Sequence, residues 1–316
     1  METQGFITYL EGIGLAQLTQ KQYLLALNKF FTWSKKDYLQ VAKPDVLKFL
    51  EYLKKKKGLQ NLTRQHYLIA LNHYYTFLYK NGQVTENPCL FIKIRGTRKK
   101  QLHKIYTPEE LDGLFDNYYQ LFVRGYDDSR HRHEGQRHYS RLYRERNALI
   151  VSILFNQGII TSEIERIETG NIDLIKATIK IRGAKRCNDR TLPLKATQIG
   201  LFINYLQNIR PQLLEYKTKE SEQFFLPLPA ISYKKTENDM NRGIFKPLTE
   251  QIKTIDKQFI NFQQIRASII TFWIKTQGLR KAQHLAGHRC ICTTEKYVAN
   301  DLDNLTDDIN KLHPFV

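Results

Sequence analysis

The chain has 316 residues, enough for two modest domains that each bury a core. Its formal net charge of +18 indicates a polyanionic partner, with nucleic acid favoured over an anionic membrane surface. No apolar stretch approaches the length of a membrane span, and the N-terminus lacks the basic and apolar regions of a secretory signal. Four cysteines in a chain of this size predict no disulfide framework, so we expect a cytoplasmic protein.

The positive charge is concentrated in the first third of the chain. Residues 1–106 hold 18 Lys and Arg against 6 Asp and Glu, whereas the remaining 210 residues hold 31 against 25. We therefore expect the N-terminal part to bind phosphates and the rest to have a more selective task.

Residues 1–92 predict a domain of four helices, because apolar residues recur at helical spacing between turn signals. Thr19 and Thr63 are expected to cap the second and fourth helices, and Pro44 to open the third. The aromatic stripes on these helices are interpreted as core rather than as base-stacking platforms. Outward lysines, including the run at 54–57, form either a solvated face or a set of phosphate contacts.

Residues 93–104 are rich in Lys and Arg and poor in apolar side chains, which predicts an extended basic linker. Such a linker is suited to following DNA phosphates. The candidate DNA-binding residues are Lys93, Arg95, Arg98, Lys99, Lys100 and Lys104. Thr107 and Pro108, followed by two glutamates, predict the first helix of a second domain at 105–316.

The second domain is predicted to be mainly helical with a small sheet. Residues 124–146, rich in Arg and His, are interpreted as a solvated loop, with a DNA-contacting loop as the alternative. The predicted helices are 148–155, about 161–167, and 259–276. The predicted strands are 178–182, a second one ending at 192–194 after a basic turn, and a third short one at 224–226.

Residues 278–305 contain a His and a Tyr that can meet at one site. His288 follows a Gly turn, and Thr293–Thr294 are expected to cap a short helix that carries Tyr297. A zinc site built from His284, His288 and the nearby cysteines is rejected, because the spacing matches no standard finger. We expect no metal.

The run LAGH, Thr293–Thr294 and Tyr297 resembles the end of the catalytic domain of tyrosine recombinases, the phage integrase family. The resemblance extends over nearly the whole chain. It implies a helical, SAM-like core-binding domain at 1–92, a basic linker at 93–104 and a catalytic domain at 105–316. In this family a Tyr oxygen attacks a DNA phosphodiester without a metal or nucleotide cofactor.

The resemblance also implies roles for individual residues. Tyr297 matches the nucleophile and His288 matches a histidine that bonds the phosphate or assists deprotonation of Tyr297. Gln263-Gln-Ile-Arg266 matches the family's HxxR, so Arg266 is the phosphate clamp and Gln263 stands where the family has His. Lys185, in the turn between two strands, matches the general acid; a solvated turn lysine is the alternative.

One motif departs from the family. Residues 157–164 match a run like TGLRxSEL, but Ile160 stands where the family has its first catalytic arginine. Losing one preorganised donor typically costs about a hundred- to a thousandfold in rate. Another arginine, with Arg182 and Arg166 as candidates, then fills the space, or the enzyme is slow, or the chain binds DNA without cutting it.

The sequence thus predicts a site-specific recombinase of a mobile element, acting in integration, excision or inversion. The resemblance implies a cytoplasmic, nucleoid-associated homo-tetramer on two double-stranded DNA sites, with accessory proteins that set direction. The tail 301–316 is expected to pack on a neighbouring protomer or on its own domain. The rivals are a non-catalytic DNA-binding regulator, a type IB-like topoisomerase and, least favoured, a structural or membrane-surface protein.

Overall fold

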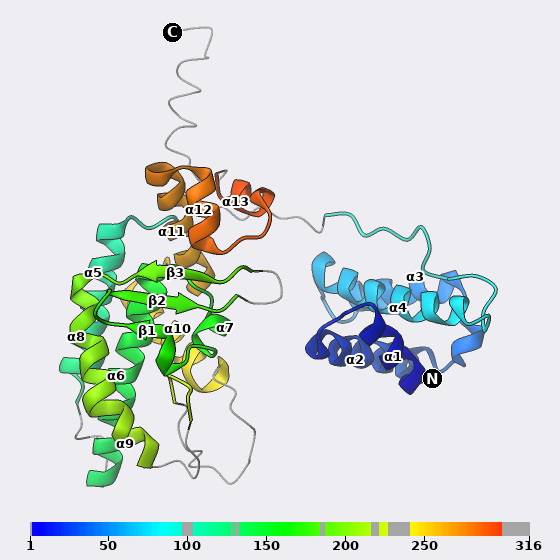
Figure 1. Cartoon of the computed structure of the whole chain (residues 1–316). Helices are drawn as coiled ribbons and strands as arrows, with labels where there is room; N and C mark the ends of the chain where they lie inside the picture. The colour runs from blue at the N-terminus through cyan, green and yellow to red at the C-terminus, as the bar shows by residue number, and fades with distance from the viewer. Residues whose placement is uncertain are drawn as a thin grey trace, which may run out of the picture. The chain divides into compact units, whose positions relative to one another are not determined.

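A computed structural model describes residues 2–96, 104–127, 129, 133–183, 187–215, 221–226 and 241–298. The chain divides into two compact units, Met1–Gln101 and Leu102–Val316 (Figure 1). The structure is mainly helical with one three-stranded sheet, which confirms the predicted fold class. Within the described ranges, every helix is too short or too polar to cross a membrane.

The first unit contains the four predicted helices. They are α1 (Thr3–Gly12), α2 (Gln17–Ser34), α3 (Lys43–Lys55) and α4 (Asn61–Lys80), with a short 3-10 turn at Tyr38–Gln40. The expected caps at Thr19 and Thr63 are wrong, because α2 and α4 each begin two residues earlier, without a capping side chain. Packing of an apolar face stabilises a helix more than its cap does, so the first turn extends past the best capping residue.

Aromatic rings fill the core of the first unit, as predicted. The ring centroids of Phe30 and Phe49 lie 5.0 Å apart, edge to face, and those of Phe6 and Tyr74 lie 5.2 Å apart. All four side chains are fully buried. Edge-to-face pairs of this kind add specific stabilisation to the burial of apolar area.

The second unit opens with α5 (Pro108–Tyr119). As predicted, Thr107 caps this helix: its Oγ1 accepts a hydrogen bond from the Glu110 nitrogen at 3.2 Å. The Glu110 carboxylate in turn accepts from the Thr107 nitrogen at 2.9 Å, which completes a capping box.

The helix α6 (Glu134–Gln157) is much longer than the sequence predicted. The interpretation of residues 124–146 as a loop is therefore wrong from 134 onward. Arg146 explains the error, because a charged residue occupies a fully buried position on this helix. Its guanidinium donates to the Leu226 carbonyl at 2.7 Å and to Asn147 Oδ1, and it lies over the ring of Tyr143.

The sheet has the order β1-β2-β3 and is antiparallel throughout. Its strands are β1 (Ile172–Asp173), β2 (Thr178–Ile181) and β3 (Arg190–Pro193). The predicted hairpin is β2 and β3, but the third strand is β1 and not 224–226. Phe224, Phe225 and Leu226 lie outside the sheet, and their side chains are buried in the core of the second unit.

The helix α6 lies at the centre of the second unit, packed against α5, α8 and α11 (Figure 1). The other helices that complete this unit are α7 (Thr161–Ile164), α8 (Ala196–Asn204), α9 (Arg210–Glu215), α10 (Lys246–Ile255), α11 (Phe262–Gln277), α12 (Leu279–Ala286) and α13 (Ile291–Val298). Shorter helical turns cover Gln120–Arg124, Thr169–Asn171, Tyr205–Ile209 and Asn241–Phe245.

Two leucines of α2 provide a matched test of the first core. Leu27 is fully buried and Leu25 is 62% exposed. We expect Leu27→Ala to lower the free energy of unfolding by about 2–5 kcal/mol, and Leu25→Ala to change it by less than about 0.5 kcal/mol. Urea unfolding followed by circular dichroism measures both; equal losses would contradict the assigned core.

Candidate active site

Arg266, on the second turn of α11, joins segments that are far apart in the sequence. Its guanidinium donates to the carbonyl oxygens of Gly158, after α6, and of Ala286, at the end of α12. The same Nη2 atom lies 3.2 Å from His288 Nε2. Arg266 is only 6% exposed, so these contacts compensate a charge that is otherwise costly to bury.

The tautomer of His288 follows from these partners. A guanidinium only donates hydrogen bonds, so His288 Nε2 is the acceptor and the ring proton is on Nδ1. Nδ1 then donates to Thr294 Oγ1 at 2.9 Å. The expectation that Thr293–Thr294 cap the last helix is wrong: α13 begins at Ile291, and Thr294 is buried as the support of His288.

Tyr297 lies against this histidine. The two rings stack with centroids 5.8 Å apart and planes 13° from parallel. Tyr297 is partly exposed, whereas His288 beneath it is buried. The prediction that His288 and Tyr297 lie together is confirmed, and they contact each other through their ring faces.

His288 is kept neutral by its surroundings. Burial, and then the positive charges of Arg266 and Arg190, lower the pKa of His288 to about 4. At neutral pH the ring is therefore an oriented hydrogen-bonding group that accepts from Arg266.

Gln263 lies one turn before Arg266, is exposed, and borders a cavity of about 310 Å³. Thr161, the residue after Ile160, lines the same cavity.

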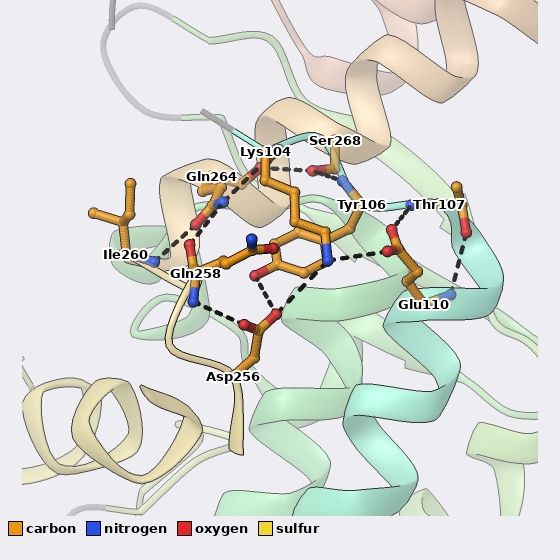
Figure 2. Close-up of polar contacts among 9 residues, drawn as sticks. All are labelled: Lys104, Tyr106, Thr107, Glu110, Asp256, Gln258, Ile260, Gln264 and Ser268. Atoms are coloured by element: carbon orange, nitrogen blue, oxygen red, sulfur yellow. Dashed lines mark hydrogen bonds and ion pairs between the residues drawn. The ribbon is translucent and has the colours of Figure 1, made fainter. Parts of the chain in front are cut away.

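The neighbouring Gln264 fixes the start of α11. Its side chain accepts from the Ile260 nitrogen at 2.8 Å and donates to the Lys104 carbonyl at 3.0 Å (Figure 2).

Lys104 is bound by acidic groups of its own unit. Its Nζ lies 3.0 Å from Glu110 and 3.9 Å from Asp256, above the ring of Tyr106 (Figure 2). Lys93 and Arg95 of the predicted basic linker are exposed. The other predicted residues Arg98, Lys99, Lys100 and Lys185, and the tail 301–316, lie outside the described residues, so their roles stay predictions.

Arg182 and Arg166, the two arginines predicted to stand in for an arginine at position 160, have other partners. Arg182 pairs with Glu168 at 2.7 Å, and Arg166 Nε donates to the Ser162 carbonyl at 3.0 Å. Both contacts are exposed to solvent. Neither arginine is among the contacts described above for Arg266 or His288.

Arg190, at the start of β3, was not singled out from the sequence. It pairs with Glu163 through two hydrogen bonds of 2.8 and 2.9 Å, and both side chains are fully buried. In the sheet it lies opposite Ile181, an inward-facing position. The sequence signal that would have identified it is a charged residue at an inward-facing strand position, on the same face as the buried Ile179 and Leu192.

Two cysteines lie beside the site. Cys290 and Cys292 are exposed thiols whose Sγ atoms are 2.8 Å apart. Among the described residues, the structure groups no three His, Cys, Asp or Glu side chains that hold a metal ion.

These features define a class of protein. The family described as phage integrase matches residues 138–303, and the phage integrase N-terminal SAM-like domain matches residues 3–83. The chain belongs to the phage integrase family.

Individual relatives are more distant. The tyrosine recombinase XerD of Staphylococcus aureus is 28% identical over 174 residues, which cover 54% of this chain and 55% of that protein. XerD of Staphylococcus saprophyticus is 30% identical over 179 residues, with the same coverage. The chain thus spans about half the length of the curated relatives it matches.

The fold is also similar to solved structures. A crystal structure of the XerH site-specific recombinase bound to a palindromic difH substrate, a post-cleavage complex, aligns with a TM-score of 0.64. The identity is 20%, over 92% of this chain and 79% of that one. This likeness shows a shared fold.

The pKa of His288 predicts a pH dependence of stability. In the unfolded chain the ring has its ordinary pKa of 6.5, so it binds a proton below that pH, whereas the folded chain does so only near pH 4. The contribution to stability is therefore complete above pH 6.5 and is lost as the pH falls toward 4. Between pH 7 and pH 5 we expect wild type to lose about 2 kcal/mol more than His288→Asn. Urea unfolding of both proteins measures this; parallel pH profiles would contradict a depressed pKa.

Proposed function

We propose that this chain is a site-specific DNA recombinase that cuts and rejoins DNA through a 3′-phosphotyrosine at Tyr297. The observation that carries the proposal is the contact of Arg266, His288 and Tyr297 in one site, within a chain of the phage integrase family. Their sequence positions are up to 31 residues apart, and the packing of α11, α12 and α13 joins them.

The chemistry follows from these residues. The Tyr297 hydroxyl loses its proton to solvent and its oxygen attacks the scissile phosphorus, a phosphotyrosine bond forms, and the bond to the 5′-oxygen breaks. Arg266 binds the phosphate oxygens and offsets the negative charge that grows on them, while His288 holds the guanidinium in place. Lys185 protonates the leaving 5′-oxygen. A 5′-hydroxyl from another strand later attacks the phosphotyrosine and releases Tyr297.

Two positions of the site differ from the family pattern. Gln263 replaces the histidine of HxxR and acts as a hydrogen-bonding group that does not titrate near neutral pH. Ile160 stands at the place of the first arginine, so a second cation has to come from elsewhere in the fold.

Double-stranded DNA is the proposed substrate. Supporting this are the net charge of +18 and the difH DNA in the XerH structure to which the chain is similar. The core-binding domain at 1–92 and the linker at 93–104 grip phosphates, and the catalytic domain at 105–316 cuts. Four protomers act on two DNA sites in the cytoplasm, with accessory proteins that set direction.

The second candidate is a DNA-binding regulator that does not cut. Ile160 favours it, because an integrase fold without its first arginine keeps the DNA-binding surface and loses much of the rate. Covalent capture of DNA, described next, distinguishes the regulator from the recombinase.

Covalent capture tests the nucleophile. Nicked duplexes of random sequence are incubated with the chain, and those that become attached to protein in denaturing gels are amplified to define a cleavable site. We expect the wild type to form an adduct on the recovered site and Tyr297→Phe to form none, because phenylalanine lacks the attacking oxygen. Tyr297→Phe is the matched control for binding and should retard the same duplex. Binding by both proteins with no adduct from either would leave the regulator as the function.

The basic linker predicts a change in salt dependence. Lys93→Ala and Arg95→Ala should each reduce the slope of log binding constant against log salt concentration by about 0.9, because each removes one phosphate contact. Fluorescence anisotropy with the recovered duplex measures the slope. Lys176→Ala, an exposed lysine paired with Asp173, is the control. Unchanged slopes for both linker variants would exclude those contacts.

A further inference from the structure

Arg190 lies directly beneath the turn that carries His288. A Cβ atom built on Gly287 would be 2.7 Å from Arg190 Nη1, so the guanidinium lies against this turn. Gly287 has a φ of +71°, and its carbonyl accepts from the Asn188 nitrogen at 2.8 Å. The segment just before β3 and the His288 turn are therefore hydrogen-bonded to each other beside Arg190.

On its other side Arg190 is connected to Ile160. Glu163 Oε2 accepts from Arg190 Nη2 at 2.9 Å and also from the Ile160 backbone nitrogen at 3.0 Å. One carboxylate thus ties the guanidinium to the residue that stands at the place of the family's first arginine. Arg190 Nε is buried without a hydrogen-bond partner, so the guanidinium keeps an unused donor.

The ion pair does not cancel the charge felt at the site. Arg190 and Glu163 form a fixed dipole, and the atom of the pair that lies against the Gly287–His288 turn is Arg190 Nη1. The positive end of the pair is therefore nearer the His288 turn. Both groups are shielded from water, which leaves their field weakly screened.

We propose that Arg190 is a positioning residue that supplies, from β3, the second guanidinium charge of the site in place of the arginine missing at Ile160. It does so beneath the Gly287–His288 turn, where it stabilises the extra negative charge of the phosphate in the transition state. The inference rests on the proposed function and names the cation that this function lacks.

Scissile phosphates of different charge test it. The probe is the duplex recovered by covalent capture, prepared with either an ordinary phosphodiester or a neutral methylphosphonate at the cleavage position. A residue that acts through positive charge matters for the first probe and not for the second, whereas a residue that only maintains the fold matters equally for both.

The main variant is the double substitution Glu163→Gln with Arg190→Gln, which replaces the buried ion pair by two neutral amides of similar shape. We expect adduct formation on the phosphodiester to slow by about a hundred- to a thousandfold, with unchanged duplex binding. On the methylphosphonate the variant should match the wild type. Arg190→Lys, which keeps a charge beside Glu163, should recover part of the rate.

The matched control is Arg146→Gln. Arg146 is also fully buried in the second unit, but its guanidinium bonds a carbonyl and an amide in the core. We expect this variant to lose thermal stability and to show the same ratio of rates on the two probes as the wild type.

Several results would overturn the inference. They are equal slowing of the double variant on both probes, no slowing on either, or a charge-selective loss from Arg182→Gln or Arg166→Gln instead. If the double variant unfolds, the double substitution Glu163→Met with Arg190→Met, which replaces the buried pair by apolar side chains of similar volume, decides the question, and a wild-type ratio of rates on the two probes overturns the inference. Absence of any adduct from the wild type would overturn the proposed function itself. That result differs from the outcomes above, in which the wild type forms an adduct and only the role of Arg190 fails.

Discussion

The guanidinium of Arg266 is the contact on which this catalytic domain depends. It joins the carbonyl after α6, the carbonyl that ends α12 and the ring of His288, three segments separated by up to 130 residues. A buried guanidinium without such partners would be strongly destabilising, so the fold and the position of the cation are fixed together. These contacts engage three of the five N–H groups of an arginine, and under the proposed function the others bind the phosphate.

The same contact sets the state of the neighbouring residues. Because Arg266 only donates, His288 accepts through Nε2 and donates from Nδ1 to Thr294 Oγ1, and the ring stays neutral. Tyr297 rests on that ring, with its side chain partly open to solvent. Under the proposed function, nucleophile and phosphate clamp are therefore placed before DNA arrives, and little ordering is left for the bound state.

The sequence predicted those parts that short motifs encode. Helical spacing gave the N-terminal domain, and Arg266, His288 and Tyr297 lie in local runs whose geometry a helix and a turn determine. It failed where tertiary packing decides. The Arg-rich segment forms part of the core helix α6, in which Arg146 is buried, and its composition alone had predicted a loop. Thr294 was predicted to cap a helix, but its hydroxyl accepts a hydrogen bond from His288. Arg190 was missed because its meaning depends on Glu163, 27 residues away, and on the Gly287 turn.

The measurement that tests the central claim most directly is mass spectrometry of the covalent adduct after digestion with trypsin and nuclease. The account predicts a nucleotide linked by phosphate to the tryptic peptide that contains Tyr297, in which Tyr297 is the only tyrosine. It also predicts that the linkage is to the 3′ end of the cut strand. A nucleotide on any other residue, or a 5′ linkage at Tyr297, would contradict the account.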